Sequence, residues 1–219
     1  MASPIVEEYL EAIYKLQAED KPLGTTELGK MLGVSPASAT EMMNRLADKG
    51  LVAKDRGKGI TLTKKGEKAA LELIRKHRIS ERFLVDVLGV DWKDAHDEAC
   101  KFEHVLSPEV ETRMEALLDK PTTCPHGQPI PDRHGKTVVE NIRRLSSLKR
   151  RQSGVIAKIS EERRELLEYL ATLGLMPDRM VRVEQIAPFE GPMLVQVGGA
   201  SYALGREIAE KIWVKEKER

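Results

Sequence analysis

Four residues that can bind a metal ion recur at helical spacing between positions 96 and 104. His96, Cys100, Glu103 and His104 stand at i, i+4, i+7 and i+8, so an α-helix would carry them on one face. Thiolate, carboxylate and imidazole groups together suit Fe(II), Mn(II), Co(II) or Zn(II), and they do not suit Mg(II) or Ca(II). The spacing therefore predicts a transition-metal site on this helix.

Further candidate ligands lie on both sides of this helix. His77 and Glu81 are four residues apart, Glu8 and Glu11 are three apart, and the segment Cys124-Pro125-His126-Gly127 pairs a thiol with an imidazole. Taken singly, such residues are more often solvated or packed than bound to metal. Four of the five histidines and both cysteines fall in these groups. This concentration favours metal binding.

Periodicity divides the elements that must position these residues into three blocks. It predicts short helices and a small hairpin over residues 4–65, long amphipathic helices over 66–120, and short strands with glycine and proline turns over 153–214. The connector Lys120–Gln152 contains four prolines in its first part and is therefore irregular there. We expect a mainly α chain with a small β domain, with boundaries at 1–65, 66–145 and 146–219.

The first block has the order of a winged helix-turn-helix. Ser35 and Pro36 are typical of a helix start, and the helix that follows runs to Lys49 and ends at Gly50. A turn over residues 56–59 then gives a basic-tipped hairpin, or wing. Small polar residues can approach base edges, and basic residues bind phosphates. The residues expected to contact DNA are Thr26, Ser35, Pro36, Ala37, Ser38, Thr40, Asn44, Arg45, Arg56 and Lys58.

Charge is segregated along the chain although its net value is only +1. Residues 21–82 hold 14 Lys and Arg against 7 Asp and Glu, whereas residues 86–119 hold 3 against 10. Segregated charge is often only solvated surface, and an ordinary helical bundle with a basic face is the alternative here. Together with the winged-helix order, the split favours a polyanion partner for the first block and a cation site in the second.

Composition limits the number of domains and the class of protein. The chain has 219 residues, of which 41% are hydrophobic and 4% aromatic, which allows one large domain or two to three small ones. Its apolar runs are too short to cross a bilayer, and its start lacks the pattern of a signal peptide. We expect a cytoplasmic protein without membrane contact, in which two cysteines are free thiols or metal ligands.

At these residues the sequence resembles the diphtheria toxin repressor family of metal-dependent regulators. The resemblance covers nearly the whole chain, and it is carried by residues 8–14, by residues 34–40, by Lys76-His77-Arg78 with Glu81, and by His96-Asp97-Glu98-Ala99-Cys100 with Glu103-His104. It implies a dimer with an N-terminal winged helix-turn-helix, a helical dimerisation domain and a C-terminal SH3-like β-barrel.

The resemblance also implies two metal sites in each protomer. The regulatory site would contain Glu8, Cys100, Glu103 and His104, joined by His77 in the manganese-type arrangement. The second would contain His77 or His96 with Glu81, Cys124 and His126, and an acid from the third domain. By spacing, Glu161 is the nearest match for that acid, with Glu162 close behind.

The sequence departs from both metal subtypes of the family. Iron-type members resemble it at Cys100 but have Met where Glu8 stands, whereas manganese-type members have an acid at Glu8 but Glu where Cys100 stands. One thiolate with two carboxylates and an imidazole fits Fe(II) slightly better than Mn(II). Zn(II), Co(II) and Ni(II) are possible substitutes.

The expected function is therefore a repressor, not an enzyme, that binds a palindromic operator on double-stranded DNA when loaded with Fe(II) or Mn(II). It would control genes of metal homeostasis. Two alternatives are a DNA-binding regulator with structural zinc and a different effector, and a cytosolic metal-binding protein or enzyme. No HisGluXXHis pair occurs in the sequence to favour a metal hydrolase.

Overall fold

A computed structural model describes residues 3–17, 23–55, 59–138 and 141–216. The chain divides into two compact units, Met1–Lys76 with Pro131–Lys136, and His77–Ile130 with Thr137–Arg219. Within the described residues, no helix combines the length and apolar character needed to cross a membrane.

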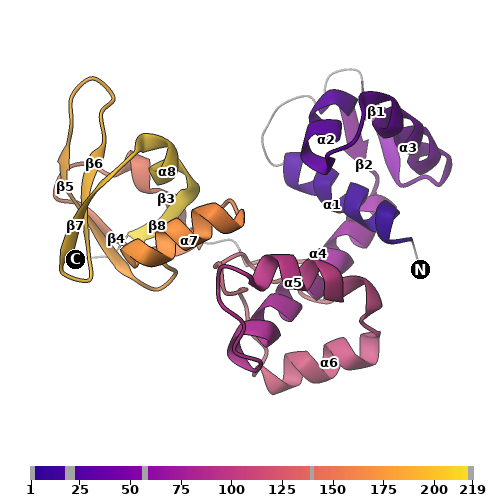
Figure 1. Cartoon of the computed structure of the whole chain (residues 1–219). Helices are drawn as coiled ribbons and strands as arrows, with labels where there is room; N and C mark the ends of the chain where they lie inside the picture. The colour runs from indigo at the N-terminus through magenta and orange to yellow at the C-terminus, as the bar shows by residue number, and fades with distance from the viewer. Residues whose placement is uncertain (1–2, 18–22, 56–58, 139–140, 217–219) are drawn as a thin grey trace. The chain divides into compact units, whose positions relative to one another are not determined.

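The first unit is the predicted winged helix-turn-helix. Its helices α1 (Pro4–Gln17), α2 (Thr25–Leu32) and α3 (Pro36–Asp48) gather with the antiparallel hairpin of β1 (Val52–Asp55) and β2 (Gly59–Leu62), and the long helix α4 (Lys64–Asp86) follows (Figure 1). The core consists mainly of aliphatic side chains from all three short helices and the hairpin. Among them are Leu10, Ile13, Leu28, Ala39, Met43 and Leu46.

Local sequence explains how α3 begins. The Ser35 hydroxyl accepts a hydrogen bond of 3.1 Å from the backbone N–H of Ser38, and Pro36 occupies the first helical turn. The chain turns between α2 and α3 at Gly33, whose φ of 65° is a left-handed conformation that glycine adopts without steric cost. The predicted helix start is thus confirmed.

The second unit begins with the last part of α4 and continues through α5 (Ala95–Phe102), a 3-10 turn (Glu103–Val105) and α6 (Pro108–Leu117). Their small core contains Ile79, Leu106, Met114 and Ile130. One expectation needs correction, since the helix that carries His96 and Cys100 ends at Phe102. Glu103 and His104 lie in the tighter 3-10 turn, and the four residues do not share one helical face.

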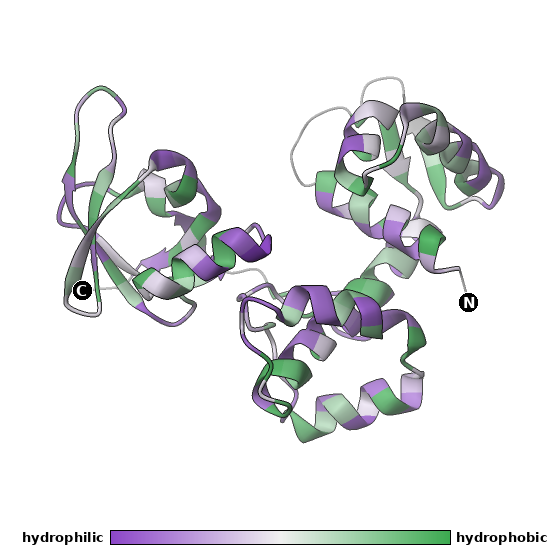
Figure 2. Cartoon of the chain, viewed as in Figure 1, coloured by the Kyte–Doolittle hydropathy of each residue, from purple (hydrophilic) through white to green (hydrophobic). Residues whose placement is uncertain are grey.

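The rest of this unit is a six-stranded antiparallel sheet with strand order β3-β8-β4-β5-β6-β7. Its elements are β3 (Ile142–Arg144), a 3-10 turn (Leu145–Ser147), β4 (Ser153–Ile159), α7 (Arg164–Leu173), β5 (Met180–Ile186), β6 (Met193–Val197), β7 (Ala200–Leu204), α8 (Arg206–Lys211) and β8 (Ile212–Glu216). Hydrophobic and hydrophilic residues alternate along α7 (Figure 2). Its buried Leu166, Leu167 and Leu170 join the apolar face of the sheet in one core.

Candidate metal centre

Helix α4 supplies the middle of a buried cluster of potential ligands. His77 and Glu81 are one turn apart, with 3% and 0% of their surfaces exposed. His77 Nε2 lies 3.1 Å from Glu81 Oε1, and Nδ1 of the same ring contacts Glu103 Oε2 in a short hydrogen bond. Because one ring nitrogen donates to Glu103, the other is oriented toward Glu81.

Helix α5 adds His96 and Cys100 to the cluster, as the spacing predicted. His96 Nδ1 lies 3.0 Å from His77 Nε2 and 3.4 Å from Glu81 Oε1. On the other side of the ring, Nε2 lies 3.8 Å from the sulfur of Cys100. The two helices therefore bring two imidazoles, a carboxylate and a thiol together within the second unit.

The segment after α6 forms a tight loop that carries Cys124 and His126. Cys124 N–H donates to Gln128 O, and Gly127 N–H donates to Cys124 O, both at 2.9 Å. Gly127 has a φ of 82°, and a Cβ there would lie 2.0 Å from Ala157 O in β4. Only glycine allows so close a backbone approach. The loop is thereby packed against the β domain.

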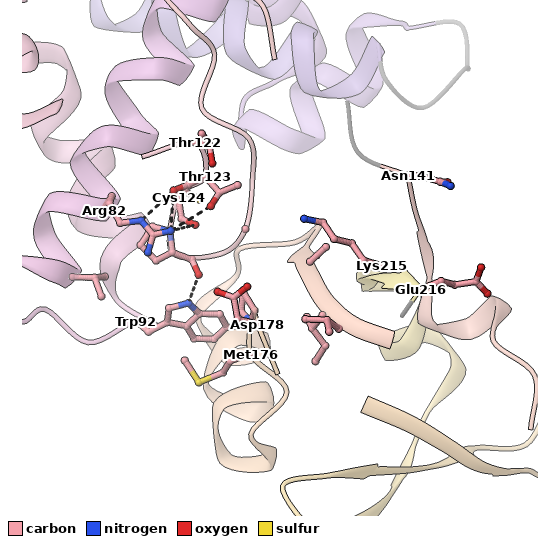
Figure 3. A pocket seen from close by; sticks show the side chains of 17 residues that line it. Arg82, Trp92, Thr122, Thr123, Cys124, Asn141, Met176, Asp178, Lys215 and Glu216 are labelled. Carbon is pink, nitrogen blue, oxygen red and sulfur yellow. Dashed lines mark hydrogen bonds between the residues drawn. The ribbon is translucent and has the colours of Figure 1, made fainter. Parts of the chain in front are cut away.

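Two side chains that sequence reasoning did not identify hold this loop. The guanidinium of Arg82 donates to the carbonyl oxygens of Thr123 and Cys124 at 2.9 and 3.1 Å, and the indole N–H of Trp92 donates to Pro125 O at 2.8 Å (Figure 3). Neither residue is a metal ligand type, so no ligand motif could single it out. Their hydrogen bonds fix the backbone that leads into His126.

His126 presents one particular nitrogen to the cluster. Its Nε2 lies 2.9 Å from the carbonyl oxygen of Trp92, so Nε2 carries the proton and donates it. In the neutral ring, Nδ1 is then the lone-pair nitrogen, and it lies 3.3 Å from Glu81 Oε1. Across the described residues, buried His126 Nδ1 and Glu81 Oε2 have no hydrogen-bond partner. Such atoms fit a cation held between them.

Of the two acids expected from the β domain, Glu162 lies beside the cluster, and Glu161, the nearest match by spacing, does not. Glu162 Oε2 lies 3.3 Å from His96 Nδ1, and Glu162 Oε1 lies 4.0 Å from His126 Nδ1. Glu161 instead forms ion pairs with Arg163 and, at 2.9 Å, with Lys211. The chain therefore points successive side chains in different directions as it leaves β4.

Charge within the cluster shifts several pKa values. Burial opposes the charge of Glu81, but the charge of His77 and contacts with three imidazoles hold the pKa of Glu81 well below its usual range. Burial also opposes protonation of His96, yet Cys100, Glu81 and Glu162 raise its pKa to about 10. Burial and the two carboxylates raise the pKa of Cys124 well above its ordinary value. The carboxylates thus favour the protonated form of the neighbouring imidazoles, and a metal ion that binds there must displace these protons.

The opposite end of the cluster holds Cys100, Glu103 and His104. Burial would raise the pKa of the Cys100 thiol, but hydrogen bonds from His77 and His96 and their charges lower it overall. Glu103 is fully buried, and its Oε1 lies 3.5 Å from His104 Nε2. A lowered thiol pKa favours the thiolate that binds metal. This end therefore has the donor chemistry of the predicted regulatory site.

The remaining predicted residues lie in the first unit. Glu8 and Glu11 stand on α1, where Glu11 forms an ion pair of 3.0 Å with Lys15. The DNA-facing candidates on α2 and α3 are exposed, whereas Arg56 and Lys58 lie outside the described residues. The exposed candidates are Thr26, Ser35, Pro36, Ala37, Ser38, Thr40, Asn44 and Arg45. They form the small, polar and basic side of the winged helix.

Three family descriptions match successive parts of the chain. Residues 1–60 match the N-terminal DNA-binding domain of iron-dependent repressors, residues 63–132 match their metal-binding and dimerisation domain, and residues 143–216 match the FeoA domain.

Individual relatives agree with these matches. Iron-dependent repressor IdeR of Mycobacterium bovis is 32% identical over 95% of this chain and 96% of its own length. A solved manganese-dependent transcriptional repressor in complex with manganese has a TM-score of 0.87 and 34% identity, covering 97% of this chain and 100% of its own. The repressor ScaR with bound Cd2+ has a TM-score of 0.85 and 33% identity, covering 97% and 99%. This chain belongs to the iron-dependent repressor family of metal-dependent transcriptional repressors.

Proposed function

We propose that this chain represses transcription as a homodimer that binds a palindromic operator when it is loaded with Fe(II) or Mn(II). The observation that supports the proposal is the buried run of donors from Cys100 through His77 and Glu81 to His126, in a chain that also carries a winged helix. Donors of this mixture bind transition metals, and an exposed helix with small N-terminal residues reads the major groove.

The activating ion would be held by Cys100, Glu103 and His104 of the second unit, and the family resemblance adds Glu8 of α1 to this ligand set. When bound, the ion would supply positive charge to a buried carboxylate and a thiolate. His77 orients Glu103 by donating a hydrogen bond to its Oε2. The imidazoles beside Cys100 lower the pKa of its thiol, which favours the thiolate form.

The winged helix would read DNA through α3. Ser35 caps the helix, and the first turn presents small side chains that allow close approach to base edges. Arg45 is exposed further along α3 and would contact a phosphate. Any coupling of metal to DNA binding is reciprocal, so operator DNA must raise the apparent metal affinity by the same factor.

The decisive test measures DNA binding as a function of metal. Chelator-stripped protein would be mixed with random duplexes at one salt concentration, without oxygen, and with Fe(II), Mn(II), Zn(II) or no added metal. Salt must be constant because phosphate contacts make affinity depend steeply on it. Cys100→Ala removes the thiol, and His134→Ala replaces an exposed histidine outside the cluster as a control.

We expect enrichment of a palindrome with Fe(II) or Mn(II) only, lost in Cys100→Ala and retained in His134→Ala. Equal enrichment without metal would instead identify a DNA-binding regulator with structural zinc and another effector. Metal binding without DNA binding at low salt would leave a metal-binding protein or enzyme. Either result contradicts the proposal.

A further inference from the structure

Helix α3 directs one acidic side chain away from the core of the winged helix. Ala39 and Met43, which are 0% and 1% exposed, mark the side of α3 that packs on this core. Glu41 is exposed and lies two residues from each of them, which is about 200° around an α-helix. Its carboxylate therefore stands near the middle of the exposed face of the helix that follows the turn of the DNA-binding domain.

The hydroxyl groups around Glu41 already have partners within α3 and its cap. The hydroxyl oxygens of Ser35 and Ser38 lie 2.9 Å apart, and the Thr40 hydroxyl donates to Pro36 O at 2.7 Å. Side chains that form such local hydrogen bonds have fewer donors and acceptors left for a base edge. The task of reading a base through a hydrogen bond therefore falls on the other polar side chains of this face.

The Glu41 carboxylate has no local partner of this kind. Arg45 stands four residues further on, at the spacing at which acids and bases pair along a helix. Even so, no ion pair or hydrogen bond involves Glu41 in the part of the chain that the structure describes. The phosphates of a duplex repel an unpaired carboxylate on a helix that enters its groove. Glu41 therefore weakens binding to every sequence that does not offer it a hydrogen-bond donor.

Only two bases offer such a donor in the major groove. Cytosine presents its N4 amino group and adenine its N6 amino group, whereas guanine and thymine present acceptors. Adenine also presents the acceptor N7 beside its amino group, while cytosine presents no acceptor on this edge. An ionised carboxylate only accepts hydrogen bonds, so cytosine is its complement. A glutamine, which both donates and accepts, is the complement of adenine.

We propose that Glu41 determines operator specificity by accepting a hydrogen bond from the N4 amino group of a cytosine in each half-site. The inference rests on the proposed function, which supplies the operator and its two halves. The carboxylate acts in two ways at this base pair. Its hydrogen bond favours cytosine, and its charge disfavours the bases that present acceptors at the same place.

The test compares the sequences that four proteins select from a pool of random duplexes. Metal-loaded full-length wild type, Glu41→Ala, Glu41→Gln and Asp48→Asn would be used at one salt concentration. We expect one position of each half-site to be cytosine for the wild type, to lose its preference with Glu41→Ala, and to become adenine with Glu41→Gln. Because Glu41 is exposed and unpaired among the described residues, these substitutions should leave folding intact.

Asp48 provides the matched control for charge. It is also exposed, and it is the last residue of α3, almost two turns beyond Glu41. Asp48→Asn removes one negative charge from the same helix but leaves its first two turns unchanged, and those turns are where a recognition helix contacts bases. We expect Asp48→Asn to retain the preference for cytosine.

A second measurement removes the donor from the base instead of the acceptor from the protein. In the selected duplex, the cytosine would be replaced by 2-pyrimidinone, which lacks the N4 amino group. The loss of affinity should be larger for the wild type than for Glu41→Ala by about fivefold or more, the lower end of what a base contact provides. Any effect of the weaker base pair appears in both proteins and cancels in this comparison. Equal losses in both proteins would contradict the contact.

The outcomes separate this inference from the proposed function. Metal-dependent enrichment of a palindrome with the same base preferences in the wild type and both Glu41 variants would overturn the inference alone. A base other than cytosine at the position that Glu41→Ala relaxes would overturn the assignment to cytosine. The expected change in base preference without any dependence on metal would overturn only the proposed metal switch. Failure to enrich any sequence would overturn both.

Discussion

His77 Nε2 lies 3.1 Å from Glu81 Oε1, one turn further along α4. The opposite nitrogen of the same ring contacts Glu103. A single imidazole therefore connects the carboxylate of the candidate activating site to the buried carboxylate of Glu81. A substitution at one end of the cluster should therefore affect the other end through the contacts of this imidazole.

Replacing His77 should weaken metal binding at both ends. His77→Gln removes a candidate ligand beside Glu81 and the hydrogen bond that orients Glu103, and loss of such orienting bonds costs about 10–100-fold in metal affinity. Competitive Mn(II) titration of His77→Gln and His134→Gln measures the effect. An affinity loss confined to one class of site would show that the ring does not connect them.

Gly127→Ala should disrupt the loop that carries Cys124 and His126. The added Cβ would lie 2.0 Å from Ala157 O and would occupy a φ of 82°, so the backbone must move. Gly198→Ala is the control, since Gly198 also has a positive φ, 57°, but nothing within 4 Å of its Cβ. Metal counts should fall by one in the first variant alone. Equal losses in both would assign the effect to backbone conformation.

Ser35→Ala should destabilise the winged helix by about 1 kcal/mol, because it removes the hydrogen bond to Ser38 N–H. Urea unfolding of metal-free protein measures this change. Thr40→Ala, whose hydroxyl bonds to Pro36 O within the same helix, should change stability by less than about 0.5 kcal/mol. A larger loss of stability in Thr40→Ala than in Ser35→Ala would contradict the role of Ser35 as the helix cap.

Arg45→Ala should weaken binding to all DNA sequences about equally. It should also reduce the slope of log K against log salt concentration by about one, because one phosphate contact is lost. Arg45 is exposed on α3, whereas Arg113, exposed on α6 and paired with Glu109 at 2.9 Å, serves as the control. Binding isotherms at several salt concentrations distinguish them. Loss of affinity for one sequence only would indicate that Arg45 reads a base.

Metal affinity should increase with pH. His96 has a pKa of about 10 in the metal-free protein, so below that pH its ring is protonated. A metal ion needs the neutral ring and must displace this proton. Affinity for an ion bound by His96 should therefore rise up to tenfold per pH unit for this proton between pH 6 and 8. Calorimetry in buffers of different ionisation enthalpy counts the protons, and zero release would refute the expectation.

Local spacing predicted much of the site. His77 with Glu81 and His96 with Cys100 are one helical turn apart, and helix geometry alone brings such pairs together. Cys124 and His126 share a short loop, so their proximity also needs no tertiary information. The 3-10 turn at Glu103 was not predictable from the same pattern, because it depends on how the chain after α5 packs.

Sequence spacing could not identify which acid of the β domain faces the cluster. The pairing of β4 with β8 shifts between Ile156 and Lys158, which breaks the alternation of buried and exposed residues along β4. Whether Glu161 or Glu162 faces the cluster depends on that bulge, and spacing does not locate bulges. Strand β3 lies outside the predicted strand region, because its three residues are too few to form a recognisable pattern.

The hydrogen bonds that hold the loop also give the protein an intrinsic optical reporter. The indole of Trp92 lies with its ring centre 5.0 Å from that of His126. Emission from this indole is therefore sensitive to whatever occupies the position beside that imidazole, and a paramagnetic ion there would quench it. Trp213, the second tryptophan, has the cationic groups of Arg144 and Lys158 each 5.2 Å from its ring centre instead. Fluorescence could thus follow metal binding beside His126 in real time, without a label.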